Sequence, residues 1–500
     1  MSFDFLFGFR TWTLVFILAS TYLFRSRRRS PFPPVNQYPG DFLNRKAYRE
    51  YSQNAESLIA QGLAKHKGPI TLRAPNAEKI ILPASLTAWV KSNKDLDHRE
   101  LVRQDFYAGL PGFEVQDALH SRGDLLLDMV RTKLGQNDSI MPTVNASLAK
   151  AMQIHFGEGE DWHPIDWQKD TTGIISRAAS SIFIGPELCD DPEWLEIIQG
   201  YVGAFFTAVN ELHAYPAWTR PIVQRFLPNA ANCRKYMARA RVITKELLEK
   251  RQKEIKKAQL EGRAPPEYND ALTWTQAVSD STLDPGEIQL SLAMAALFTT
   301  SELFRQVLID IASNPSIIEP LKQEILQQIS THGITVAATN NMVLMDSVLK
   351  ESQRLSAACV GLERVALKDL TMPDGNKLPR GSHIMVDCQD LWNPAGYPNP
   401  EQFDGYRFLR KREAGDKFSQ FVQSGPDYSV FGGGRHTCPG RYFANNELKL
   451  AMAHILLKYD IRVANSHQSK PMQMGVYRMV DPVVPFEVRR MKTEVPEILG

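Results

Sequence analysis

One ten-residue segment near the C-terminus constrains this 500-residue chain more than any other feature. It spans residues 431–440 and reads FGGGRHTCPG, with three consecutive glycines and one cysteine, Cys438. Because glycine has no side chain, such a run lets the backbone approach a flat ligand closely. Arg435 and His436 supply positive groups near the cysteine. The segment therefore predicts a loop that holds a thiolate against a planar group.

A cysteine thiolate can ligate haem iron, and its electron donation favours cleavage of an O–O bond. The segment matches F-x-x-G-x-(R/H)-x-C-x-G, a pattern expected by chance in less than about one chain in 10,000 of this composition. It resembles the haem-binding loop of the cytochrome P450 superfamily of haem-thiolate monooxygenases. The alternative is a buried cysteine in a glycine-rich turn. The resemblance implies haem b as cofactor and Cys438 as the axial iron ligand. The other residues that it implies at the haem are Phe431, Gly434, Arg435, His436, Gly440 and, by motif position, Arg364.

Two further matches follow in the order that the family requires. Glu351 and Arg354 lie three residues apart on a predicted helix at 342–355, so they share a face. An E-x-x-R pair alone occurs about once or twice by chance in a chain of this size. The later segment PEQFDGYRF contains Arg407, which matches the third member of the family's buried structural triad. The resemblance therefore implies that these three residues support the haem loop from behind.

The clearest predicted helix begins after Asp284, a good N-cap followed by proline, and ends before Pro315. Its segment AALFTT, residues 295–300, aligns with the family pattern A-(G/A)-x-(D/E)-T-(T/S). The resemblance implies that Thr299 is the catalytic residue that orients dioxygen and relays protons. An ordinary threonine on a buried helix is the alternative.

The chain departs from the family pattern at two places. Phe298 stands where an acid is usual, and phenylalanine cannot carry a proton. Bound water, a substrate hydroxyl or Glu302, which shares a face with Thr299, would then relay protons. The W-x-x-x-R element expected near residues 130–150, which contacts a haem propionate in many members, is missing. Arg364 and His436 remain the expected propionate partners.

The N-terminus carries a candidate membrane anchor. Residues 5–24 contain one charge, and twenty helical residues at about 1.5 Å each span the roughly 30 Å hydrocarbon core. Four arginines follow between 25 and 29, which by the positive-inside rule places the rest of the chain in the cytosol. A cleaved signal peptide is the alternative. We expect an anchor and basic flank at 1–30, a proline-rich hinge at 31–40 and a catalytic domain at 41–500, in the endoplasmic reticulum membrane.

Elsewhere the pattern is mostly helical, with a long charged amphipathic helix at 232–262 and two predicted hairpins at 68–82 and 376–386. The resemblance covers essentially the whole chain and implies the mainly helical cytochrome P450 fold with small β-sheets. Hydrophobic residues make up 43% of the chain, which is enough for a large core. The formal charge is only +2, so no basic footprint for nucleic acid is present. The other four cysteines fit neither a disulfide framework nor a CxxC zinc site and are interpreted as small core residues.

Residues 424–460, which hold the haem loop and the predicted helix after it, and residues 345–355 look like fungal members that act in secondary metabolism, similar to the branch that oxidises gibberellin diterpenoids. The resemblance implies an apolar substrate, dioxygen, a membrane and NADPH–cytochrome P450 reductase as partners. By motif position, residues 107–115, 357–362 and 474–477 could line the pocket, and the substrate could be a terpenoid, polyketide or alkaloid. A dehydrating, isomerising or peroxide-using haem enzyme and a non-catalytic haem-binding membrane protein remain alternatives.

Overall fold

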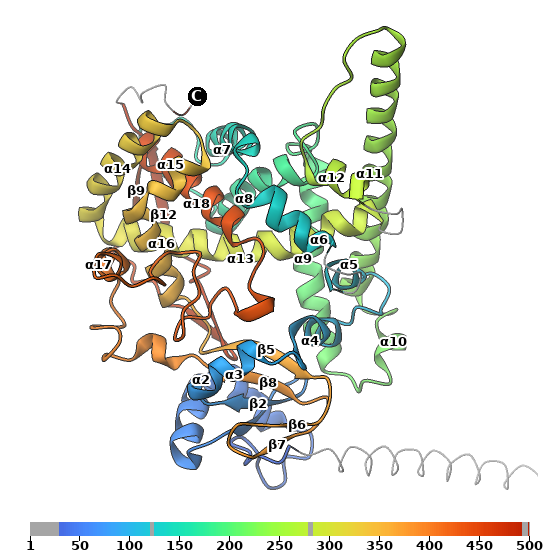
Figure 1. The fold of residues 1–500 in the computed structure, drawn as a ribbon, viewed down its shortest axis with the longest axis vertical. Helices are drawn as coiled ribbons and strands as arrows, with labels where there is room; N and C mark the ends of the chain where they lie inside the picture. The colour runs from blue at the N-terminus through green and yellow to red at the C-terminus, as the bar shows by residue number, and fades with distance from the viewer. Residues whose placement is uncertain (1–29, 121–124, 279–283, 493–498, 500) are drawn as a thin grey trace, which may run out of the picture.

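The computed structural model describes residues 30–120, 125–278, 284–492 and Leu499. The predicted anchor at residues 5–24 and its basic flank lie outside the described residues. Figure 1 shows a large body of helices with a small sheet region at its lower end. This arrangement confirms the prediction of a mainly helical fold with small sheets.

The helices of the described part follow one another along the chain as α2 (Arg45–His66), α3 (Thr87–Ser92), α4 (His98–Asp105), α5 (Val115–His120), α6 (Leu125–Met129), α7 (Met141–His155), α8 (Trp167–Phe183), α9 (Pro192–His213), α10 (Arg220–Val223), α11 (Pro228–Leu260), α12 (Ala271–Val278), α13 (Pro285–Ser313), α14 (Ile318–His332), α15 (Val336–Asn341), α16 (Val343–Leu355), α17 (Arg407–Glu413) and α18 (Arg441–Lys458). A π-helix, η2 (Val130–Leu134), continues α6. Short 3-10 helices are η1 (Ala84–Leu86), η3 (Asp138–Ile140), η4 (Pro315–Ile317), η5 (Gln389–Trp392) and η6 (Gly434–His436).

The strands form one five-stranded sheet and three smaller ones. The large sheet has the order β1-β2-β8-β5-β3, and the others are β4-β12-β9, β10-β11 and β6-β7. The strands are β1 (Ile70–Arg73), β2 (Glu78–Leu82), β3 (Leu96–Asp97), β4 (His163–Pro164), β5 (Val360–Ala366), β6 (Leu370–Thr371), β7 (Lys377–Leu378), β8 (His383–Asp387), β9 (Tyr459–Val463), β10 (Met472–Met474), β11 (Tyr477–Met479) and β12 (Phe486–Arg490).

One predicted hairpin is confirmed and the other is wrong. Strands β1 and β2 pair antiparallel within the predicted segment 68–82. In the segment 376–386, β7 pairs with β6, whereas β8 pairs with β2 and β5. Strand β7 thus forms a local pair with the strand before it, whereas β8 lies between two strands of the large sheet, one of which is distant in the sequence. The predicted hinge at 31–40 lies along β1, where the Thr71 N–H donates to the Pro33 carbonyl.

The central helix is α13, and its ends are those that the sequence predicts. The Asp284 side chain accepts a hydrogen bond from the Glu287 N–H at 3.0 Å, and Pro285 occupies the first turn. Among the described residues, α13 is the one helix long and apolar enough to cross a membrane. It instead packs against α8, α9 and α11 in the interior, so it is the core helix of the folded body.

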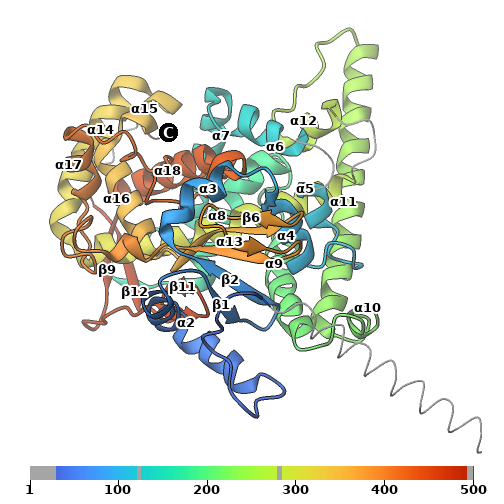
Figure 2. The same cartoon turned by 60° about the horizontal axis from the view of Figure 1, so that its bottom comes forward.

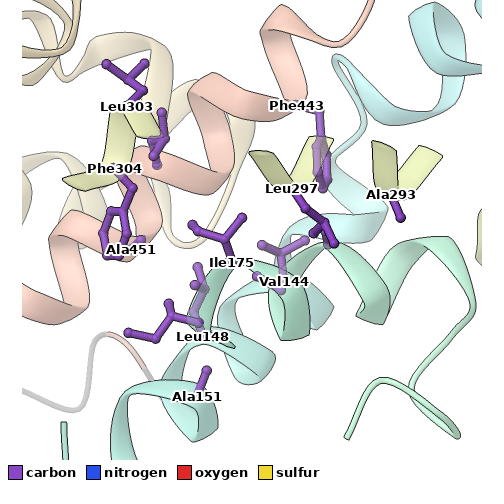
Figure 3. Close-up of a cluster of buried hydrophobic side chains, with 14 of the residues drawn as sticks. Val144, Leu148, Ala151, Ile175, Ala293, Leu297, Leu303, Phe304, Phe443 and Ala451 are labelled. Atoms are coloured by element: carbon purple, nitrogen blue, oxygen red, sulfur yellow. The ribbon is translucent and has the colours of Figure 1, made fainter. Parts of the chain in front are cut away.

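The core of the helical body lies where α7, α8, α13 and α18 meet. Figure 3 shows Leu297 of α13 beside Phe443 of α18, with Val144 of α7 and Ile175 of α8 on the adjoining sides. All four side chains are buried. Phe443 lies only five residues after Cys438. Packing of the central helix therefore also fixes the chain segment that leaves the cysteine loop.

Helix α18 carries a buried acid that makes stability depend on pH. Glu447 is fully buried, and neither of its carboxylate oxygens has a hydrogen-bond partner among the described residues. Burial raises the pKa of Glu447 to about 8. The folded state therefore keeps a proton that the unfolded chain loses near pH 4.5, and stability falls as the pH rises from about 4.5 to about 8.

The Glu447→Gln variant should remove this part of the pH dependence. We expect wild type and variant to unfold at similar urea concentrations near pH 4.5. At pH 8 the variant should be the more stable, by up to about 5 kcal/mol, because one pKa unit corresponds to about 1.4 kcal/mol. Urea titrations at both pH values measure the difference. Parallel pH profiles for the two proteins would contradict the account.

Candidate active site

A cavity of about 410 Å³ lies where the cysteine loop meets β5 and the beginning of α4. Its lining includes Cys438, most of the loop before it, and cationic residues from three separate segments. Two of the three predicted pocket stretches contribute, because residues from 357–362 and Tyr477 line it. Residues 107–115 are not part of this lining. The cavity thus brings together segments that are far apart in the sequence.

The glycines allow the loop to adopt its own backbone conformation. Gly432 and Gly434 have positive φ angles of 76° and 63°, which side chains rarely tolerate. A Cβ at Gly434 would lie 2.2 Å from the carbonyl oxygen of Lys91 in α3, and one at Gly432 would lie 2.7 Å from that of His436. The Cys438 N–H closes the loop by donating to the Phe431 carbonyl at 2.8 Å. The glycine run therefore permits a tight turn pressed against α3.

The surroundings of Cys438 act on the pKa of its thiol in opposite directions. Burial raises the pKa of its thiol, while the N–H groups of Gly440 and Arg441 at the beginning of α18 act in the opposite direction. The described residues contain no group of three or more histidines, cysteines or acids that could hold a metal ion. A metal bound by Cys438 must therefore take its remaining ligands from a non-protein group, as iron does in a porphyrin.

Buried nitrogen donors, of which Arg364 is the cation, form one side of the cavity. Arg364 is only 2% exposed, and its Nε has no hydrogen-bond partner. The Nε2 of His436 is likewise buried and unpartnered, 3.6 Å from an oxygen of Asp97. Burial, followed by the nearby Arg364 charge, lowers the pKa of His436 to about 3, so this ring is neutral. The ring of His98 lies 6.2 Å from that of His436. These donors call for an anionic ligand.

Arg435 is placed differently from the other predicted haem contacts. It lines the cavity, but its Nη2 donates to the Lys94 carbonyl and to the Asp97 carboxylate, both at 2.8 Å. Almost half of its side chain is exposed. Its guanidinium is therefore committed to α4 and the strand before it. Arg364 is the stronger partner for an anion in the cavity.

The structure brings the three members of the predicted triad together. Glu351 accepts two hydrogen bonds at 2.9 Å from Arg354 and one at 3.0 Å from Arg407. All three side chains are at most 5% exposed. The arginines also donate to backbone carbonyls, including those of Leu391 and Pro398 at 2.8 and 2.7 Å. The triad thus fastens α16 to the segment around α17.

Two further residues of α16, Asp346 and Lys350, hold the segment that leads into the cysteine loop. The Lys350 ammonium donates to three carbonyls at 2.8 Å each, those of Phe418, Gln420 and Gln423. Four residues earlier, the Asp346 carboxylate accepts from the Phe421 N–H at 2.8 Å. The ring of Phe421 then packs at 5.2 Å against that of Phe431 in the loop. Helix α16 therefore holds the segment before the cysteine loop through Lys350 and Asp346, separately from the triad.

The Lys350→Met variant should destabilise the protein by about 3 kcal/mol, because it removes the buried Lys350 donor from three carbonyls at once. Lys417→Met is the matched control, since Lys417 lies in the same segment but is exposed. Thermal unfolding of both variants measures the difference. Equal melting temperatures would contradict the proposed role of Lys350.

Thr299 lies on α13 rather than in the lining of the cavity. Ala295, Phe298 and Thr299 are accessible, although the helix is buried on its other faces. The Thr299 hydroxyl donates to the Ala295 carbonyl at 3.0 Å. Phe298 packs against Phe206 of α9 with ring centroids 5.2 Å apart. The position usually held by an acid therefore contributes to an aromatic wall.

The Glu302 carboxylate is bonded to Arg305 and to the backbone after β11. It pairs with Arg305 and accepts from the Val480 N–H at 3.0 Å. Arg305 in turn donates to the hydroxyls of Thr171 and Thr172 on α8. Through these bonds, Glu302 and Arg305 connect α13 to α8 and to the segment after β11. The geometry therefore does not favour Glu302 as the proton relay.

Comparison with known proteins decides the family. The cytochrome P450 family model matches residues 121–488. The cytochrome P450 monooxygenase adrA of Penicillium rubens is 32% identical over 492 residues, covering 96% of each chain. The monooxygenase hepE of Aspergillus oryzae is 34% identical and covers 98% of this chain and 91% of its own. Cytochrome P450 monooxygenase 1 of Gibberella fujikuroi is 35% identical over 85% of this chain and 98% of its own.

This chain belongs to the cytochrome P450 family. The fold agrees: the haem domain of cytochrome P450DA superposes with a TM-score of 0.66 at 17% identity, over 92% of this chain and 97% of its own. A retinoic-acid-bound cyanobacterial member, CYP120A1, gives 0.67 at 15%, over 92% and 99%. The protein is therefore a monooxygenase with haem b as its cofactor.

The residues present in this cytochrome P450 fit haem b. The single cysteine ligand suits an iron whose other ligands are porphyrin nitrogens. The unpartnered donors of Arg364 and His436 suit the propionate groups. When haem is bound, Cys438 would hold its iron, and these two side chains together with His98 would hold its carboxylates.

Sequence reasoning missed two arginines of this site. Arg131 and Arg99 both line the cavity, and Arg131 follows Leu127 by four positions, with Leu127 also in the lining. Leu127 and Arg131 have the spacing of the W-x-x-x-R element, but leucine stands in place of its tryptophan, so the full pattern is missing as predicted. A search for the arginine and its spacing alone would have found Arg131. No local pattern marked Arg99, which follows β3 and His98.

Proposed function

We propose that this cytochrome P450 oxidises a bulky apolar secondary metabolite, a terpenoid, in a fungal biosynthetic pathway. It uses dioxygen and electrons from NADPH–cytochrome P450 reductase at the endoplasmic reticulum membrane. One observation carries the proposal: the cavity that contains Cys438 and its cations also has an apolar wall. That wall includes Ala357, Val360, Leu362 and Val430. The resemblance to fungal members that oxidise gibberellin diterpenoids supports the terpenoid class.

When bound, haem supplies activation of dioxygen and insertion of one of its oxygen atoms into a C–H bond. The chain's own residues prepare this chemistry. Cys438 would donate electron density to the bound iron, and Arg364 would compensate the charge of a propionate. The apolar wall excludes water and orients the substrate skeleton. The Thr299 hydroxyl can hold a proton on α13, and because Phe298 carries none, protons reach it from water or from a substrate hydroxyl.

Turnover with labelled oxygen tests this function. Purified holoenzyme with reductase, NADPH and ¹⁸O₂ should convert terpenoid substrates to products that carry one ¹⁸O atom. Conversion should stop when reductase is left out. Product formation with hydrogen peroxide alone, or products without the label, would contradict the proposal and favour the peroxide-using or isomerising alternative.

Membrane attachment is part of the proposal. An apolar patch on and beside α10 consists of Trp218, Ile222 and Phe226, each more than 60% exposed. Figure 2 shows α10 toward the same lower edge as β1. Such a patch on a folded surface is typical of a membrane or protein contact.

Contacts connect this patch to the place where the described chain begins. The Arg220 guanidinium lies 5.0 Å above the ring of Tyr107, close to Asp105 at the end of α4. Asp105 pairs with Lys79 of β2 at 2.6 Å. In the neighbouring position of β2, Glu78 accepts from the Ser30 N–H. The α10 patch is thus linked through Tyr107, Asp105 and β2 to Ser30, the first described residue, and the proposal turns this side of the protein toward the bilayer.

Protease protection in microsomes tests the attachment. An N-terminal tag should be protected in the lumen, while a C-terminal tag is digested, and the protein should resist extraction by carbonate. Trp218 fluorescence, isolated by difference against Trp218→Phe, should be quenched by brominated lipids. Release by carbonate or digestion of both tags would contradict single-pass anchoring.

A further inference from the structure

The cavity contains one acidic side chain, which the chemistry at the haem does not use. Among its described lining residues, Glu363 is the only acid. Its carboxylate accepts a hydrogen bond from the hydroxyl of Tyr477 at 2.8 Å. Tyr477 also lines the cavity and retains 41% of its surface exposed. A carboxylate paired with a tyrosine thus lies within a wall that has cationic, apolar and neutral polar residues but no second acid among those described.

A β-bulge places Glu363 there. In a regular strand, successive side chains point to opposite faces, so neighbours do not share a cavity. Between Gly361 and Arg364 the register of β5 against β8 shifts, and Leu362 has a φ of 50°. As a result, Leu362, Glu363 and Arg364 all line the cavity. Positive φ at leucine is strained, and such strain clusters at functional sites.

The Glu363 carboxylate can accept further hydrogen bonds besides the one from Tyr477. The Glu363 charge, with burial, raises the pKa of Tyr477 well above its ordinary value, so the tyrosine stays protonated and donates. Its single hydroxyl can satisfy one of about four acceptor positions on a carboxylate. Arg364 does not neutralise Glu363 through a side-chain bond, because its Nη1 donates to the Glu363 backbone carbonyl at 2.7 Å.

We propose that Glu363, together with Tyr477, binds a hydroxyl group on the otherwise apolar substrate. The proposal rests on the function proposed above and narrows its substrate class. A carboxylic acid would be repelled by Glu363. An ammonium group is disfavoured because the buried guanidinium of Arg364, the next residue, lines the same cavity. The substrate is therefore a neutral terpenoid that already carries a hydroxyl, supplied by a reaction that places oxygen on the hydrocarbon skeleton.

Ligands that share one skeleton test this assignment. Purified full-length holoenzyme is titrated with dehydroabietane, its alcohol dehydroabietinol, dehydroabietic acid and dehydroabietylamine, and binding is followed by calorimetry and by the optical shift on substrate binding. In the wild type, the alcohol should bind about 10-fold or more tighter than the hydrocarbon, because a hydrogen bond to a charged group is strong. The acid and the amine should bind more weakly than the alcohol.

Variants of Glu363 test whether this residue causes the preference for the alcohol. Glu363→Leu should abolish the advantage of the alcohol, and Glu363→Gln, which retains an acceptor, should leave part of it. Val360→Ala is the matched control on the same wall and should weaken all four ligands alike. Equal binding of alcohol and hydrocarbon in the wild type, no binding by any of the four, or an unchanged preference in Glu363→Leu would overturn the inference.

A carbon monoxide band at about 450 nm in the same samples separates the two proposals. If the band is intact and the alcohol is still not preferred over the hydrocarbon, only the role of Glu363 is overturned. If the band is absent, the monooxygenase function itself is overturned.

Discussion

The Glu351→Leu variant should lose about 3 to 5 kcal/mol of its free energy of unfolding, because it leaves two buried guanidinium groups without their carboxylate. Arg354 and Arg407 would keep their bonds to backbone carbonyls but lose their only acidic partner in the triad. We expect poor expression and a preparation that retains little haem. Chemical denaturation and the ratio of haem to protein measure the effect.

Arg410→Leu is the matched control for this prediction. Arg410 lies on α17 with Arg407, but its pair with Asp404 is exposed. An exposed pair contributes about 1 kcal/mol or less. Equal losses in Glu351→Leu and Arg410→Leu would contradict the view that burial makes the triad indispensable.

The Arg364→Leu variant should weaken haem retention by about 10- to 100-fold, because the substitution removes a buried charged donor. Burial lowers the pKa of Arg364 to about 10, so an anion bound beside this guanidinium would stabilise its charged form. The rate of haem transfer to apomyoglobin measures retention. Arg435→Leu should have the smaller effect, since its guanidinium is bonded to Asp97. A larger effect in Arg435→Leu would reverse this assignment of the propionate partners.

Features with a strong local signal were predictable from the sequence. The Asp284 cap and the following proline fixed the beginning of α13, and the confirmed hairpin at 68–82 needs only its own residues to pair. The triad was predictable because motif order and spacing identified its members, and the structure joins Glu351 to both arginines. Helix α11 begins at Pro228, four residues before the predicted start, because Pro228 can occupy the first turn of a helix.

What the sequence could not predict depends on partners that are distant in the chain. Strand β8 looked like half of a hairpin, yet β2 and β5 flank it. Arg99 and Arg131 reach the cavity only because α4 and η2 fold back onto the cysteine loop. Glu363 has no motif, and its place depends on a register shift against β8. The occupation of Glu302 by Arg305 and the Val480 backbone likewise depends on tertiary packing.

The most direct test of the central claim is the carbon monoxide difference spectrum of the reduced full-length protein, measured beside Cys438→Ala. The account predicts a band at about 450 nm for the wild type, as expected of thiolate-ligated haem, and its complete loss in the variant. An intact band in Cys438→Ala, or no haem signal in well-folded wild type, would contradict the assignment of Cys438 as the axial ligand.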